Sequence, residues 1–534
     1  MPLPTADRSA EYPRKAAELL LRQIGQAPEQ RAARRLSARA PATDGGRRVL
    51  VVTPRDWAAH VQCEAMIAQA LRLRGADVTF LTCGGALEVC DRANTYEAPP
   101  MPCTTCTRYV EGSLDAHRFA HISIRDGWEA GDPLPWQEID EVARVDLPAV
   151  VDDGLPLGRL VDIPLKWFLC AASLDDEPLA GLTTRAFLRS ARRIASGIER
   201  ALDVVRPDTV LLLNGLFLFE AVAWAICARR GIDVVTYERA FLKDTLVFSR
   251  GAPAGFYDLT ERWEEQNRPL TAQESAQLDE YLSTRRAGGA ADQFWSFDHR
   301  EEQQRSDGRL VVLFTNLTWD TAVIGRHVAF PDIRSWLDFV IAEFAARPGD
   351  RLVLRVHPSE VRLPMKRTRD SLERYIADHH SALPPNIDVI GGSRSTDSYG
   401  LIDSCDLGLV YTSTTGLELA LAGKPVVVAG DVHYRGKGFT VDVQDPRGLA
   451  EAISVGLDDP AALRTDMEAA RRYAHFFWFR GPVAAPFVRE PLPGLARLTT
   501  NDLDDLRPGA NADVDRVCGM ILEGPTTPAR TATR

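Results

Sequence analysis

The 534-residue sequence lacks the hallmarks of several large protein classes. Residues 1–10 contain no apolar core, so we expect no signal peptide and a cytoplasmic location. Basic residues are not in excess, because 63 Lys and Arg face 74 Asp and Glu, and the net charge is −11. This balance gives no electrostatic support for a nucleic-acid partner. The most apolar stretch, residues 210–228, is interrupted by Asn214, Gly215 and Glu220, which disfavours a membrane span.

Motifs of common nucleotide-binding and metal-dependent enzymes are also missing. The sequence has neither a G-x-G-x-x-G fingerprint nor a P-loop, and it has no internal repeat beyond the alternation of strands and helices. No D-x-D motif ends a predicted strand, and we expect acidic pairs such as Asp152-Asp153 to form solvated turns. The sequence therefore gives no sign of a dissociable catalytic metal.

Nine cysteines are present, an odd number that, without a secretion signal, favours a reducing compartment. Four of them fall within one short region: Cys83, Cys90, Cys103 and Cys106. The last two form a C-x-x-C knuckle, and four thiolates could hold a structural zinc ion. An iron–sulfur cluster and unpaired thiols are the alternatives that we keep open, partly because the spacing from Cys83 to Cys90 is unusual for a zinc knuckle.

Strands and helices alternate over most of the chain, which predicts an α/β protein with two Rossmann-like domains. Residues 1–44 carry an excess of arginine and form either a basic helix that touches an anionic membrane surface or a solvated extension. The boundaries that we expect are as follows: 1–44, the basic N-terminal extension; 45–257, an N-terminal Rossmann-like domain with an irregular cysteine-containing insertion at about 83–190; 258–308, the interdomain connection; 309–475, a C-terminal Rossmann-like domain; and 476–534, an aromatic and then Pro-rich tail.

The stretch LVYTSTTGLELALAGKPVVVAG, residues 409–430, is the most informative part of the sequence. An apolar strand is followed by a cluster of hydroxyl residues, a helical pattern, the stop signal at Gly423 and a second strand. This order is one parallel βαβ step, in which Thr414 or Thr415 can cap the helix. The turn follows the carboxyl end of a strand, where open α/β sheets bind ligands, so we expect it to hold a phosphate or diphosphate.

Several motifs in this half of the chain resemble those of one enzyme family. The pair His357-Pro358 ends a predicted strand about fifty residues before Thr412-Ser413-Thr414. This order resembles the donor-binding motifs of bacterial sialyltransferases and of capsule polysaccharide synthesis proteins, which include the Kdo transferases. The stretches 314–320, 434–440 and 476–479 strengthen the resemblance, which covers roughly residues 310–480.

The resemblance implies a glycosyltransferase of the GT-B kind, with two Rossmann-like domains that face a central cleft. For the nucleotide-sugar donor, the candidate residues are Arg355, His357, Thr412, Ser413, Thr414, Glu418 and Lys437. His357 can donate to a phosphate or ribose oxygen, and the hydroxyl residues add donors around the same phosphate. For the base near the acceptor, the candidates are Asp56, His60 and Glu238, with Glu220 as an alternative. Each of these four also has a purely structural interpretation as a turn residue, a helix-start residue or a buried partner.

We therefore expect transfer of a sugar from a nucleotide-activated donor to a saccharide or lipid-linked acceptor in surface polysaccharide synthesis. A CMP-linked sugar is favoured, and transfer needs no dissociable metal because protein donors can stabilise the leaving phosphate. The alternatives are a teichoic-acid-type polyol-phosphate transferase, a nucleotide-sugar 2-epimerase and a non-catalytic, zinc-stapled scaffold of a polysaccharide assembly complex. The basic extension would add peripheral contact at the inner face of the membrane.

Overall fold

The computed structural model of the chain describes residues 28–41, 45–96, 101–126, 136–175, 177–287, 308–363, 366–380, 382–394, 398–459, 462–463, 465–492, 494–500 and 502–523. Most of the basic extension expected at 1–44, and the later part of the connection expected at 258–308, lie outside these residues. In the described part of the chain, no helix combines the length and apolar character that crossing a bilayer requires.

The first domain is built on a seven-stranded sheet. Its strands lie in the order β13 (Val483–Ala484), β6 (Thr245–Arg250), β5 (Asp233–Arg239), β4 (Thr209–Leu213), β1 (Arg48–Val52), β2 (Asp77–Thr82) and β3 (Ala120–Ser123). The five strands from β5 to β3 are parallel, whereas β6 and β13 add antiparallel pairs at one edge. Strands such as β1 and β4 are apolar after their first residue because a parallel sheet is covered on both faces.

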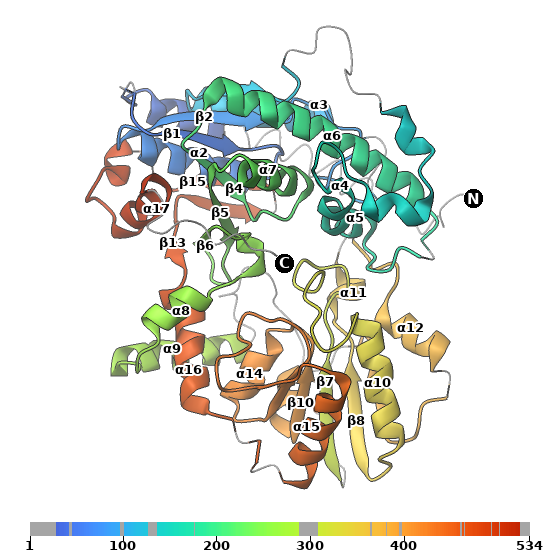
Figure 1. Cartoon of the computed structure of the whole chain (residues 1–534). Coiled ribbons are helices and arrows are strands. Elements are labelled where there is room, and N and C mark those ends of the chain that lie inside the picture. Colours follow the sequence, from blue (N-terminus) through green and yellow to red (C-terminus); the bar gives the residue numbers. More distant parts are fainter. Residues whose placement is uncertain are drawn as a thin grey trace.

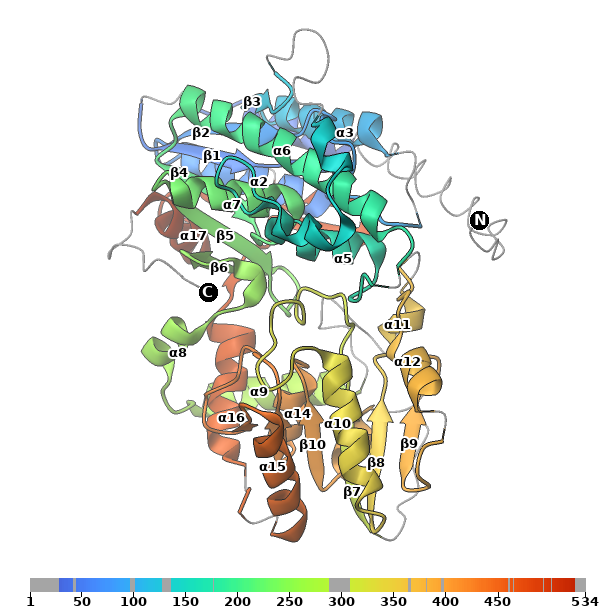
Figure 2. The same ribbon diagram turned by 45° about the vertical axis from the view of Figure 1, so that its right-hand side comes forward.

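Helices cover both faces of this sheet (Figures 1 and 2). Their bounds are α2 (Ala58–Arg72), α3 (Cys103–Ala116), η1 (Gln137–Asp140), η2 (Arg144–Ala149), α4 (Leu157–Leu160), α5 (Asp162–Leu169), α6 (Ala180–Val205), α7 (Leu218–Arg229) and η3 (Ala254–Phe256). The region expected as an irregular insertion thus carries several short elements, and β3 within it extends the sheet.

The second domain is built on a six-stranded sheet in which every pair of neighbours is parallel. Its strands lie in the order β12 (Val441–Asp442), β11 (Val426–Val428), β10 (Leu407–Val410), β7 (Arg309–Phe314), β8 (Asp350–Arg355) and β9 (Ile387–Ile390). Its helices are α10 (Ile333–Ala345), α11 (Ser359–Arg362), α12 (Leu372–His379), α13 (Ser398–Ser404), α14 (Thr415–Leu421), α15 (Pro446–Asp458) and α16 (Met467–His475). Asp332 and Asp445 cap α10 and α15 by accepting from backbone amides of the first turn.

The two-domain α/β architecture expected from the sequence is therefore confirmed. In the connection between the domains, the chain forms α8 (Thr260–Gln266) and α9 (Ala272–Arg286). A capping box starts α9, because Thr271 and Glu274 satisfy each other's backbone amides. These two helices pack against α16 and the aromatic π-helix η4 (Phe476–Arg480), where Trp263 and Tyr281 contact aromatic rings.

The expectation of a C-terminal tail from residue 476 is wrong for the described residues. After η4 the chain returns to the first domain, where β13 pairs with β6 (Figure 1). The hairpin of β14 (Val488–Leu492) and β15 (Leu495–Leu498), the turn η5 (Leu503–Leu506) and α17 (Ala512–Leu522) then pack against α2 and its neighbours. The side chains of Val514, Val517 and Ile521 join the core of that domain, so α17 belongs to the first domain.

Candidate active site

The carboxyl edge of the second sheet contains a topological switch point between β7 and β10. From β7 the chain steps to β8 and β9 on one side, and it then returns to place β10 on the other side of β7. Ligands of open α/β sheets bind in the crevice that such a reversal leaves at the carboxyl ends of the strands. Here the loops after the two strands meet, because the side-chain oxygen of Asn316 accepts from the backbone N–H of Thr412 (3.2 Å).

The hydroxyl-rich turn after β10 lies at this crevice, as the sequence predicts. The hydroxyl of Ser413 accepts from the backbone N–H of Thr415 (3.3 Å), and Tyr434 donates to the carbonyl of Ser413 (2.6 Å). The expected cap is therefore corrected: Thr414 occupies the cap position of α14 without a side-chain bond, and Ser413 takes that role. Tyr434, at the back of the turn, is fully buried and fixes its backbone.

Three buried hydroxyl groups gather at the carboxyl ends of the central strands. They belong to Thr318 after β7, Ser359 after β8 and Thr412 after β10. Each side-chain oxygen is inaccessible to solvent and has no hydrogen-bond partner among the described residues. Buried hydroxyls are rarely left without partners in native proteins, so a cluster of three at one sheet edge indicates a place where a ligand completes the bonding.

His357 follows the carboxyl end of β8, two residues before Ser359. Its backbone N–H donates to Thr315 (2.9 Å), and its Nδ1 atom accepts from the backbone N–H of Ser359 (3.2 Å). Burial, with a smaller contribution from Arg355, lowers the pKa of His357 to about 4. The ring is therefore neutral near pH 7, and acceptance at Nδ1 places its proton on Nε2. His357 can serve as a neutral N–H donor, not as a cation.

Three other candidates for donor binding are engaged by the protein itself. The guanidinium of Arg355 donates to the carbonyl of Gly391 (3.0 Å), and burial lowers its pKa to about 10. The carboxylate of Glu418 accepts from Arg285 of α9 at 2.8 and 2.6 Å. Lys437 donates to the hydroxyl of Thr260 (3.0 Å). A donor-binding role for these three stays a prediction.

On the first domain, Glu238 lies at the carboxyl end of β5, next to the switch point between β1 and β4. Its carboxylate accepts from the side chain of Asn214 (3.1 Å) and from the backbone N–H of Arg239 (2.7 Å). Burial raises the pKa of Glu238, and Asp320 of the second domain adds to that rise. Glu238 is therefore within electrostatic reach of the opposite domain.

Asp320 is the site residue that the sequence reasoning did not single out. Its carboxylate accepts from the hydroxyl of Thr321 (3.2 Å) and the backbone N–H of Ala322 (3.1 Å), and burial raises its pKa. Burial raises the pKa of Tyr257 first, and Glu238 and Asp320 raise it further, so the phenol lies within electrostatic reach of both carboxyl groups. Asp320 ends the 314–320 stretch that strengthened the family resemblance, and its place in the loop after β7 was the available signal.

The remaining acceptor-side candidates differ in how they are held. Asp56 forms an ion pair with Arg92, in which one pair of atoms is 3.2 Å apart. His60, in the first turn of α2, lies with Nδ1 3.2 Å from the hydroxyl of Tyr237. Burial, and then Arg239 and Arg55, hold the pKa of His60 well below its usual range. His60 is consequently neutral near pH 7, as a proton acceptor must be.

The alternative candidate Glu220 is part of a buried ion network. The guanidinium of Arg55 bonds to Glu220 and, at 2.7 Å, to Asp91. All three side chains are at most 5% exposed. The structural interpretation of Glu220 was a buried partner, and its pairing with Arg55 favours that role.

The four clustered cysteines lie within electrostatic reach of one another. Cys83 raises the pKa of both Cys90 and Cys106, and Cys103 raises the pKa of Cys83. Burial is the first cause that raises the pKa of each thiol. Among the described residues, however, no group of three or more His, Cys, Asp or Glu side chains is arranged to hold a metal ion. The arrangement does not fit a four-thiolate zinc site, and zinc stays a prediction that metal analysis of the purified protein tests.

A clasp, which we define as residues 366–370, joins the second domain to the first next to α11, where the backbone N–H of Thr368 donates to the carbonyl of Glu360 (3.0 Å). Arg369 pairs with Glu177 through two bonds of 2.8 Å, and Asp370 accepts from the backbone amides of Ala172 (3.0 Å) and Ser173 (2.9 Å). Under the clasp, the rings of Trp167 and Trp319 pack edge to face across the domains at 5.2 Å. These contacts hold the two carboxyl edges facing each other, with α5 above α11 and α12 in both views (Figures 1 and 2).

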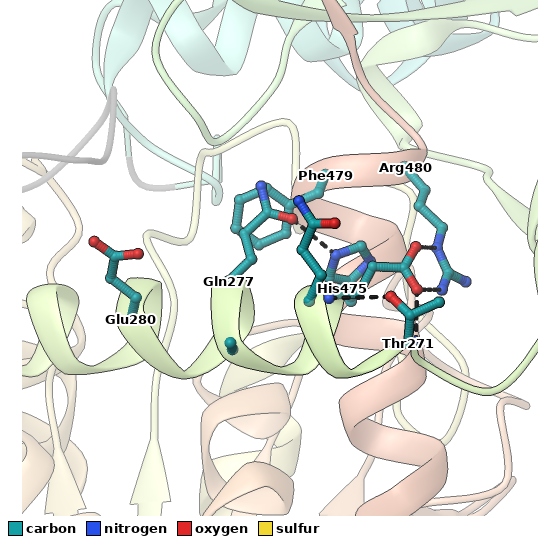
Figure 3. Close-up of a pocket in the computed structure, with 9 residues that line it drawn as sticks. Thr271, Gln277, Glu280, His475, Phe479 and Arg480 are labelled. Atoms are coloured by element: carbon teal, nitrogen blue, oxygen red, sulfur yellow. Dashed lines mark hydrogen bonds and ion pairs between the residues drawn. The ribbon is translucent and has the colours of Figure 1, made fainter.

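A separate surface pocket lies between α9 and the end of α16, away from these residues (Figure 3). Two of its charged groups pair with each other, since Arg480 donates to both carboxylate oxygens of Glu274 (3.0 and 2.8 Å). His475 shares a hydrogen bond with Gln277 (3.1 Å). The pocket lies apart from His357 and the buried hydroxyl groups at the carboxyl edge of the second sheet, and we place the candidate active site at that edge.

Two Rossmann-like domains whose carboxyl edges face each other define the GT-B class of fold. Residues 267–450 match the sequence model of a family that is described as capsule polysaccharide biosynthesis protein. The expected family resemblance is therefore confirmed over about a third of the chain, the part that contains the donor-side residues.

Solved structures with a similar arrangement share little sequence with the chain. KpsC of Thermosulfurimonas dismutans, a β-Kdo 2,7 transferase, is 16% identical over 57% of this chain and 85% of that chain, with a TM-score of 0.34. A glycosyltransferase from Rickettsia africae is 11% identical over 90% of this chain and 100% of that one (TM-score 0.30). A UDP-GlcNAc 2-epimerase from Neisseria meningitidis is 12% identical over 80% and 97% (TM-score 0.24). No curated protein matches the sequence.

Proposed function

We propose that the chain is a glycosyltransferase that moves a sugar from a nucleotide-activated donor to a saccharide or lipid-linked acceptor in the synthesis of a surface polysaccharide. The observation that carries this proposal is the cluster of three buried, unpartnered hydroxyls at the switch point of the second domain. The family match covers the same elements. Hydroxyl and N–H donors that converge at strand ends suit the phosphate groups of a nucleotide.

In this proposal the donor phosphates lie against Thr412, Ser413 and His357. Negative charge builds up on the leaving phosphate as the bond to the sugar breaks, and these neutral donors stabilise it. Transfer then requires no dissociable metal. A CMP-linked sugar is our choice of donor, and the thermal-shift experiment below tests that choice directly.

The sugar would lie between Asp320 and Glu238, one from each domain. Of two carboxyl groups that face each other, the first to ionise raises the pKa of the second. The pair can therefore present one carboxylate, which stabilises positive charge at the anomeric carbon, and one carboxylic acid, which donates to a sugar hydroxyl.

Contact of the basic extension with a membrane stays a prediction, because most of that extension lies outside the described residues.

We expect CMP, among CMP, UDP, GDP and CDP, to raise the melting temperature of the full chain most, since a ligand that binds only the folded state stabilises it. His357→Ala removes a donor at the phosphates, and we expect it to lower the nucleotide affinity at least about tenfold and to abolish transfer. His379→Ala, at an exposed position on α12, is the matched control and should change neither. If no nucleotide shifts the melting temperature, or if His357→Ala binds and transfers normally, the donor site is not where we place it.

A further inference from the structure

A chain of hydrogen bonds runs from His60 into the core of the first domain. The hydroxyl of Tyr237 lies 3.2 Å from His60 Nδ1 and donates to Glu64 Oε1 (2.6 Å). The other oxygen of Glu64 accepts from the hydroxyl of Thr53 (2.5 Å). Tyr237, Glu64 and Thr53 are each at most 3% exposed, whereas His60 is only partly buried. The chain thus connects a partly buried ring at the start of α2 to a carboxyl group that solvent does not reach.

The directions of these bonds determine where the proton of His60 lies. An ionised carboxylate can only accept, so Glu64 takes the hydroxyl protons of both Tyr237 and Thr53. The Tyr237 oxygen has then used its proton and can only accept from the ring. His60 must consequently carry its proton on Nδ1, which leaves the lone pair on Nε2. His60 Nε2 makes no hydrogen bond with any described residue.

The direction reverses when Glu64 is protonated. Its carboxyl group would then donate into the chain, Tyr237 would donate to Nδ1, and the ring proton would move to Nε2. Burial raises the pKa of Glu64 to about 7, so both forms are accessible near neutral pH. The charged and titratable groups around the chain are Arg55, Glu220 and Cys63 beside Glu64, and Glu238 and Arg239 beside Tyr237 and His60.

We infer that Glu64, acting through Tyr237, is a positioning residue that keeps His60 Nε2 unprotonated as the proton acceptor for the hydroxyl of the sugar acceptor. This inference rests on the proposed function. In the transfer step the O–H bond of the acceptor breaks and an N–H bond forms at Nε2. The acceptor oxygen bonds to the anomeric carbon, and the bond from that carbon to the phosphate breaks, with its electron pair leaving on the nucleotide.

The tautomer of His60 can be measured without any substrate. In the full chain labelled with ¹⁵N-histidine, with the signal assigned by its loss in His60→Gln, we expect the Nδ1–H form at pH 8 and a change to the Nε2–H form with a midpoint near pH 7. Tyr237→Phe removes the acceptor of the Nδ1 proton, so the Nε2–H form should dominate at all pH values. An Nε2–H ring at pH 8 in the wild type, or an unchanged ring in Tyr237→Phe, overturns the inference.

Kinetics provide the second readout. We expect Tyr237→Phe to lower kcat about 10- to 100-fold with little change in the KM of the donor, and to remove the rise of kcat with pH through about 7. Tyr375→Phe is the matched control, because Tyr375 also donates to a carboxylate, Asp338 (2.7 Å), but lies on α12, away from both domains' proposed site residues. A wild type with the expected tautomer but no transferase activity would refute the proposed function and leave the positioning of His60 intact.

Discussion

We expect Asp320→Asn to lower kcat/KM for sugar transfer by about 100- to 1,000-fold. The amide keeps the shape and the hydrogen bonds from Thr321 and Ala322, but it cannot carry the negative charge that stabilises the anomeric carbon. The variant should therefore fold normally and bind the nucleotide as the wild type does. Initial rates at saturating and limiting donor concentrations, with a thermal-unfolding curve, separate these quantities.

The partner of Asp320 gives a sharper test of the same pair. Glu238→Gln should also reduce the rate of transfer strongly. In the double variant Asp320→Asn with Glu238→Gln, the fold-loss of rate should be much smaller than the product of the two single fold-losses, because the two groups act as a unit. Asp388→Asn, on the outer strand β9 with a side chain that is 55% exposed, should be without effect. Strictly multiplicative losses would show that the two carboxyl groups act independently, contrary to the proposal.

The pH dependence of the rate follows from the same groups. Burial raises the pKa of both Asp320 and Glu238 above the usual range of carboxyl groups. The pair provides its carboxylate only after one proton has left, so the rate should fall as the pH drops through the raised pKa of the first group to ionise. In Asp320→Asn the opposing charge is absent, and the pKa of Glu238 should be lower than in the wild type.

The parts of this structure that sequence reasoning anticipated depend on local signals. The apolar run at the start of residues 409–430 predicted a strand, and the structure has β10 (Leu407–Val410) there. The hydroxyl turn and His357 meet at one sheet edge because the carboxyl ends of parallel strands always share an edge. The family match over residues 267–450 agrees with this half of the reasoning.

What sequence reasoning missed depends on contacts between distant residues. Strand β13 has only two residues, and its sequence carries no pattern that predicts a strand. Its pairing with β6 nevertheless brings the chain back to the first domain. The residues next to Glu418 in the sequence contain no partner for its carboxylate, but Arg285 from α9 pairs with it. Asp320 follows β7 as an ordinary loop residue until the opposite domain brings Glu238 to it. Each outcome was decided by tertiary packing, which periodicity does not encode.

The second large effect that we expect comes from Gly416→Ala, a change of one methyl group behind the donor turn. A Cβ atom at this position would lie 2.0 Å from the hydroxyl oxygen of Tyr434 and 3.1 Å from Val410 Cγ2. Tyr434 is fully buried and anchors the carbonyl of Ser413, so neither side can move without shifting the turn. Overpacking of this kind costs about 1–3 kcal/mol of folding free energy, and the displaced hydroxyls should lower nucleotide affinity at least about tenfold.

Removing the obstacle should restore part of the loss. In Gly416→Ala with Tyr434→Phe, the closest atom is the ring carbon at 2.8 Å instead of the hydroxyl at 2.0 Å, so the overlap shrinks although the bond to Ser413 is lost. We expect the double variant to recover part of both the melting temperature and the affinity. Gly349→Ala, where the added atom meets nothing within 4 Å, is the control for introducing alanine itself. Gly416 touches no ligand in the proposal. A loss of affinity in Gly416→Ala that Tyr434→Phe partly reverses would therefore show that nucleotide binding depends on the position of Thr412 and Ser413. Unchanged binding in Gly416→Ala would remove this turn from the donor site.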